Sequence, residues 1–120
     1  MKETESEKED KMAKIAAIIK RPDEEYGHMT FISHTLENLQ KTVGGHIEVL
    51  PLEKGVYAIL NEEGKIRGLD PNMRVPGDIL VGTIILVGVD GEDFTDIPIT
   101  FKEWKEMKRR LEGRWTKCLV

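Results

Sequence analysis

The segment from Leu36 to Asn72 constrains the fold of this chain most, because its pattern predicts a helix, a glycine stop and three strands in succession. The helix is predicted from an apolar stripe whose spacing matches about 3.6 residues per turn. The members of the stripe recur at spacings of four, three and four residues: Ile32, Leu36, Leu39 and Val43. Thr30 or Ser33 can cap the start of this helix, and Gly44 can end it in the left-handed conformation.

The three strands of the segment are expected where β-branched residues gather or apolar and polar residues alternate. They cover residues 46–50, 55–60 and 65–69. The four residues from Asn61 to Gly64 predict a hairpin turn between the last two strands, since asparagine can start such a turn and Gly64 can adopt positive φ. Asp70-Pro71-Asn72 then predicts a break in the sheet.

Further elements are expected on both sides of this segment. Residues 12–20 predict a strand that a polar loop follows at 21–29, and residues 79–89 predict the longest strand, at the centre of the sheet after a loop at 74–78. Thr100 and Glu103 fit a capping box at the start of a second helix. The apolar stripe of that helix consists of Phe101, Trp104, Met107, Leu111 and Trp115.

The fold class that these patterns predict is α+β, with a small, mostly antiparallel sheet of about 4–5 strands packed with two helices. The chain is divided into a disordered tail at residues 1–11, an α+β core domain at 12–98 and a basic amphipathic helix with its tail at 99–120, packed on the domain. The tail prediction follows from its composition, which is rich in Glu, Lys and Ser.

Length and composition exclude several classes of protein. A chain of 120 residues supports one domain, and its single cysteine, Cys118, excludes an internal disulfide and favours a reducing cytoplasm. The polar start of the chain does not resemble a secretory signal. The longest apolar stretch, at 79–89, is shorter than the roughly 20 residues of a membrane span, so no membrane association is expected.

The net charge of −4 hides an asymmetry between the C-terminal helix and the rest of the chain. Residues 102–117 carry seven basic and three acidic side chains, so this segment has a charge of +4 and the remainder −8. Two interpretations stay open: a solvated helix face, or a contact surface for an anionic partner.

The motifs of catalysis and metal binding are not matched. The acidic turn at 90–93 lacks the ligand spacing of a calcium loop, and His28 and His34 are six residues apart, which does not fit a zinc pair on one helix. His46 and Glu48 share a strand face, but no group that would stabilise an oxyanion accompanies them. We therefore predict no catalytic residue, no metal site and no cofactor.

The charged turn after residue 60 is the strongest candidate for binding, because binding residues often lie in loops on a rigid scaffold. A nucleotide ligand would draw its basic contacts from Lys65, Arg67, Arg74 or the C-terminal helix, whereas a protein partner would contact Trp115. The complete set of candidate binding residues is Asn61, Glu62, Glu63, Lys65, Arg67, Arg74, Lys105, Arg109 and Trp115.

Several of these motifs together resemble a known family. The pieces occur in order: Leu36, Leu39 and Gln40, then Val43-Gly44-Gly45 with Glu48, then Asn61-Glu62-Glu63-Gly64-Lys65, then Asn72 and Gly82. Between Ala17 and Gly88 the chain resembles the small proteins of bacteriophages and mobile elements that form the domain of unknown function numbered 3846. The basic C-terminal helix is less typical of that family. The resemblance implies a protein of the bacterial cytoplasm, encoded by a phage or mobile element, that acts as an accessory factor on a host or defence component.

Three functional hypotheses follow. The leading one is a non-enzymatic binding protein, for example a counter-defence factor that occupies a host protein or sequesters a nucleotide signal. The second is a nucleic-acid-associated module that uses Lys105, Lys108, Arg109 and Arg110. The third is a small enzyme with an unrecognised site. A homo-oligomer is compatible with each of them.

Overall fold

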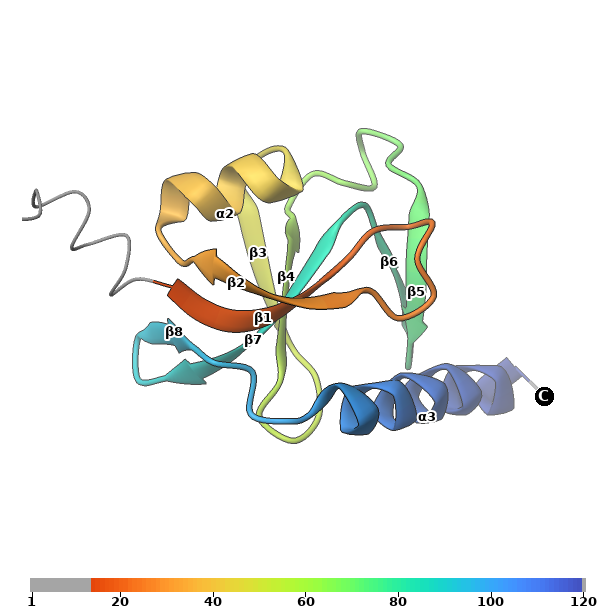
Figure 1. Cartoon of the computed structure of the whole chain (residues 1–120). Helices are drawn as coiled ribbons and strands as arrows, with labels where there is room; N and C mark the ends of the chain where they lie inside the picture. Colours follow the sequence, from red (N-terminus) through yellow and green to blue (C-terminus); the bar gives the residue numbers. More distant parts are fainter. Residues whose placement is uncertain (1–13, 120) are drawn as a thin grey trace, which may run out of the picture.

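The computed structural model describes the backbone of residues 14–119 and the side chains of residues 14–113. Within this region six strands form one antiparallel sheet (Figure 1), in the order β2-β1-β7-β4-β3, with β8 paired to β7. These strands are β1 (Lys14–Lys20), β2 (His28–Ser33), β3 (Ile47–Pro51), β4 (Tyr57–Asn61), β7 (Ile84–Asp90) and β8 (Asp93–Thr95).

A separate antiparallel hairpin and two helices complete the described fold. The hairpin consists of β5 (Pro71–Val75) and β6 (Asp78–Val81), and the helices are α2 (Leu36–Val43) and α3 (Phe101–Leu119). In Figure 1, α2 lies above the main sheet and α3 lies below it. The predicted α+β class, with a mostly antiparallel sheet and two helices, is thus confirmed.

The strand β7 lies at the centre of the core because both of its faces are apolar. Ile84 and Leu86 pack in the cluster on the α3 side, together with Trp104, whereas Ile85 and Val87 pack in the cluster on the α2 side. An uninterrupted apolar run is what a strand buried on both faces requires. Helices therefore cover both faces of the sheet.

The start of the first helix was predicted too early. Residues 28–33 form β2, and Ile32 contributes to the core from this strand instead of from a helix. The helix begins at Leu36, and the Thr35 hydroxyl caps it by accepting a hydrogen bond of 3.3 Å from the Asn38 amide. The β-branched and aromatic residues of β2 favour a strand, and pairing with β1 outweighs the helical spacing. Gly44 ends the helix with a φ of 84°, as predicted.

The predictions for residues 65–89 also need correction. Residues 62–68 form consecutive turns, so neither the strand predicted at 65–69 nor the hairpin predicted at its start is present. The next strand is β5, where a break and a loop were expected. The predicted long strand is divided into β6 and β7 at Gly82, which adopts a φ of 75°. This positive φ favours glycine, and a Cβ atom at that position would also lie 2.8 Å from Leu69 Cδ1.

The capping box at the start of α3 is present. The Thr100 amide donates to Glu103 Oε1 at 2.9 Å, and the Glu103 amide donates to the Thr100 hydroxyl at 3.1 Å. Trp104, Met107 and Leu111 of the predicted stripe are buried against the sheet. The side chain of Trp115 and the tail predicted at residues 1–11 lie outside the described region.

Replacement of Thr100 by alanine is expected to lower the free energy of unfolding by about 1 kcal/mol, because the Glu103 amide loses its hydroxyl acceptor. Urea unfolding followed by circular dichroism measures this change. Thr100→Ser keeps the hydroxyl and is the matched control. Equal losses in both variants would contradict a capping role.

Candidate functional site

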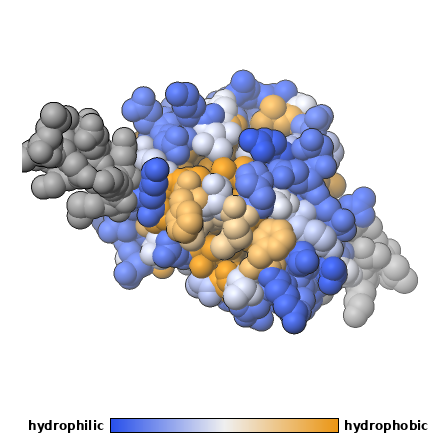
Figure 2. Space-filling model, in the orientation of Figure 1, coloured by the Kyte–Doolittle hydropathy of each residue, from blue (hydrophilic) through white to orange (hydrophobic). Residues whose placement is uncertain are grey.

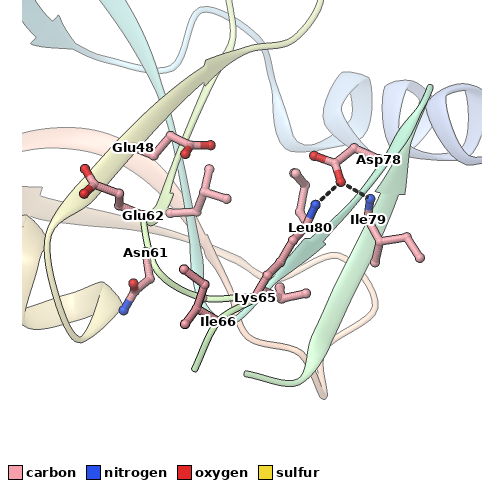
Figure 3. A pocket seen from close by; sticks show the side chains of 11 residues that line it. Glu48, Asn61, Glu62, Lys65, Ile66, Asp78, Ile79 and Leu80 are labelled. Carbon is pink, nitrogen blue, oxygen red and sulfur yellow. Dashed lines mark hydrogen bonds and ion pairs between the residues drawn. The ribbon is translucent and has the colours of Figure 1, made fainter. Parts of the chain in front are cut away.

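A small hollow lies between the end of β4, the turn that follows it and β6 (Figure 3). Its volume is about 130 Å³. Three of the residues that the sequence marks as candidates line it, namely Asn61, Glu62 and Lys65. The structure adds Glu48 from β3 and Asp78 from β6, which are distant in the sequence.

Asn61 builds the wall of this hollow and does not offer its amide to a ligand. Its side chain is buried, its Nδ2 atom donates to the Val43 carbonyl at 3.2 Å, and its Oδ1 atom accepts from the Glu63 amide at 2.8 Å. The same side chain therefore satisfies a carbonyl at the end of α2 and holds the first residues of the turn. Gly64 is needed beside it, because a Cβ atom there would lie 2.8 Å from Val81 Cγ2.

The charge of the hollow is negative. Glu48, Glu62 and Asp78 contribute three carboxylates against the single ammonium group of Lys65. Lys65 forms an ion pair with Asp78, and its hydrogen bond is the main cause that lowers the pKa of the Asp78 carboxyl. Glu48 and Glu62 are exposed carboxylates that this ion pair does not neutralise. Such a lining suits a cationic group better than a phosphate.

Two isoleucines form the apolar part of the rim. Ile66 is 87% exposed and Ile79 is 36% exposed, although both are large apolar residues. In Figure 3 they lie beside the Lys65–Asp78 pair. A single exposed apolar residue is common in soluble proteins, whereas here two lie beside one charged hollow.

The basic residues that would serve a nucleotide do not converge on this hollow. Of Lys65, Arg67 and Arg74, only Lys65 lines it. Arg67 donates from Nη1 to the Gly44 carbonyl at 2.9 Å and so binds the C-terminal end of α2. Arg74 lies on β5, and its backbone amide approaches Glu112 Oε2 of α3 at 3.4 Å.

The basic residues of α3 gather elsewhere, around the ring of Tyr26. Lys105, Lys108 and Arg109 lie 5.2–5.8 Å from the ring centroid, and Arg109 Nε donates to the Tyr26 hydroxyl at 2.9 Å. Arg110 binds Glu53 of the loop between β3 and β4. These cations contribute to the packing of α3 on the domain.

The structure also contains a buried lysine that sequence reasoning placed only at the end of a strand. Lys20 Nζ donates to Asn72 Oδ1 at 2.7 Å and to the Asn72 carbonyl at 3.1 Å. The Asn72 amide in turn donates to the carbonyls of Lys20 and Gly82, both at 2.8 Å. Burial, assisted by the charge of Lys108, lowers the pKa of Lys20 to about 8. This pair links the main sheet to the β5–β6 hairpin.

Three residues of the hollow were not predicted as site residues, because they come together with the turn only in the fold. Asp78 and Ile79 lie in a segment that the sequence assigned to a loop and a central strand, and Ile66 was assigned to a strand. Glu63 is exposed in the turn outside the hollow.

Within the described region, no three His, Cys, Asp or Glu side chains form a group that could hold a metal ion. No described helix is long and apolar enough to cross a membrane.

The fold and the hollow define a small α+β domain in which two helices cover an antiparallel sheet and a charged turn borders a shallow site. The chain belongs to the family described as a domain of unknown function, DUF3846, whose model matches residues 14–109. The match includes α3 as far as Arg109, so this part of the basic helix belongs to the family domain, beyond the end of the resemblance at Gly88. The searches of curated proteins and of solved structures found no match.

Proposed function

We propose that this protein is a non-enzymatic accessory binding protein whose hollow holds a basic segment of a protein partner. The observation that carries the proposal is the position of the exposed Ile66 beside the carboxylates of Glu62 and Glu48. A lysine or arginine side chain has an apolar stem and a cationic end, and both parts find a matching surface here.

The size of the hollow supports a protein partner over a nucleotide. Pockets for small ligands usually enclose about 300–1,000 Å³. The hollow of about 130 Å³ is well below this range and suits one side chain of a partner. The negative lining would also repel the phosphates of a nucleotide signal.

The biological setting of the proposal rests on the family resemblance. The resemblance implies a protein encoded by a phage or mobile element, so we place this one in the cytoplasm of a bacterial host, where it would act as a counter-defence factor by occupying a host protein.

The proposal predicts that a charge reversal at Glu62 weakens partner binding, whereas the same change one residue later does not. Glu62 lines the hollow and Glu63 does not. We expect Glu62→Lys and Ile66→Ser each to reduce affinity at least about tenfold, since central contact residues often contribute more than 1.4 kcal/mol. Glu63→Lys is the matched control and should bind as the wild type does.

The measurement starts from host extract passed over the immobilised wild type and the three variants, with quantitative mass spectrometry of the bound proteins. The protein enriched by the wild type and by Glu63→Lys is then purified, and its affinity for each form is measured by calorimetry. Equal affinity for Glu62→Lys and the wild type would exclude the hollow. A thermal shift with a linear or cyclic nucleotide that Lys65→Gln abolishes would favour nucleotide sequestration instead.

A further inference from the structure

The strand β2 leaves one edge of the main sheet open without the protection that such edges usually have. It is the last strand in the order of the sheet, and its six residues contain no proline, lysine or bulge. Natural proteins commonly use these features to prevent edge strands from pairing. The strand at the opposite edge, β3, ends in Pro51 and carries Glu48.

Two large apolar side chains of β2 are exposed beside this edge. Phe31 is 74% exposed and Met29 is 44% exposed. They lie opposite Ala16 and Ile18 of β1, so both project on the face of the sheet that α3 covers. Figure 2 shows apolar side chains gathered over β1 and β2, with hydrophilic residues around them.

We propose that a second copy of this chain pairs with β2 as an antiparallel strand, about a two-fold axis that places Thr30 of one copy directly opposite Thr30 of the other. Opposite residues of an antiparallel pair share one face of the sheet, so one residue of the strand must lie opposite its own copy. An axis at Thr30 places Met29 of each copy opposite Phe31 of the other. Two equivalent contacts between Met29 and Phe31 then form across the interface, as two-fold symmetry requires.

The same register brings unlike charges together at the corner next to α3. Lys105 and Arg109 lie over the ring of Tyr26, two residues before β2 begins. In an antiparallel pair the start of β2 lies beside the end of the second copy's β2, where His34 follows the strand and its Nδ1 atom contacts the carbonyl of Phe94 in β8 at 3.0 Å. The exposed carboxylates of Asp93, in β8, and of Asp96, directly after β8, are the acidic groups of the second copy at this corner.

Sedimentation equilibrium of the full chain tests the proposal. The wild type is expected to dimerise, and Phe31→Lys is expected to weaken dimerisation at least about tenfold, because it places a charge against Met29 of the second copy. Val49→Lys, a change of an exposed residue on the opposite edge strand, is the matched control and should leave the dimer intact. A monomeric wild type at about 100 µM, or a dimer unaffected by Phe31→Lys, would overturn the proposal.

A cysteine on the two-fold axis gives a test that does not depend on a destabilising substitution. In a Cys118→Ser background, Thr30→Cys places two thiols opposite each other, at a Cα separation of about 4.5–5.5 Å that a disulfide spans. Mild oxidation should link the two copies. Ser33→Cys, which lies far from its counterpart in this register, should remain unlinked. Equal linkage at both positions, or none at Thr30, would overturn the register.

Discussion

Replacement of Trp104 by alanine is expected to lower the free energy of unfolding by about 3–5 kcal/mol. The side chain is completely buried in the cluster between α3 and the sheet, so its loss leaves a large cavity. Its Nε1 atom also donates to the Tyr26 carbonyl at 2.8 Å, which the substitution leaves without a donor. Because small domains are stable by about 5–15 kcal/mol, the variant should be close to unfolding.

Guanidinium unfolding monitored by circular dichroism measures the effect. Trp104→Phe keeps one aromatic ring in the core but removes the donor and part of the buried volume, so its expected loss is smaller, about 1–3 kcal/mol. A loss below about 1 kcal/mol for the alanine variant would show that α3 does not stabilise the domain through this residue.

The stability of the protein is expected to rise as the pH increases from about 8 to 10.5, owing to Lys20. The pKa of Lys20 is lowered from 10.5 to about 8, chiefly by burial and next by the charge of Lys108. Between these values the unfolded chain binds more protons than the folded chain, so raising the pH favours folding. The pKa difference corresponds to about 3 kcal/mol, which is gained across this window and absent below it.

The difference in unfolding free energy between the wild type and Lys20→Met isolates this contribution from other titrating groups. It should increase in favour of the wild type across the window and be constant below pH 8. Lys102→Met, which removes an exposed lysine of α3, is the matched control for the loss of a lysine. A flat difference for Lys20→Met would mean that its ammonium group is well solvated in the folded state.

The elements that the sequence predicts correctly carry their signals locally. The strand that ends at Lys20, the glycine that ends α2 and the capping box at Thr100 each depend on neighbouring residues. β2 was missed because its assignment depends on pairing with β1, which no local pattern contains. At Ile32 the β-propensity of the neighbouring residues favours a strand, whereas the apolar spacing favours a helix. Pairing with β1 determines that it forms a strand.

The candidate site was predictable only in part, for a related reason. The charged turn could be identified because asparagine, glycine and charged residues share five positions. Its counterpart, Asp78, lies 13 residues beyond Lys65 and reaches the turn only because β5 and β6 form a hairpin that folds back beside it. Arg67 was predicted to bind a ligand because of its charge, but it donates a hydrogen bond to the Gly44 carbonyl at the end of α2.

The turn after β4 divides its residues between two tasks. Asn61 and Gly64 are required by the end of α2 and by the close approach of Val81. Glu62, Lys65 and Ile66 are exposed and carry no comparable constraint from the core. Under the proposed function, mutation at these three positions would redirect the protein to a new partner without loss of the fold, so binding specificity would evolve quickly on an unchanged framework.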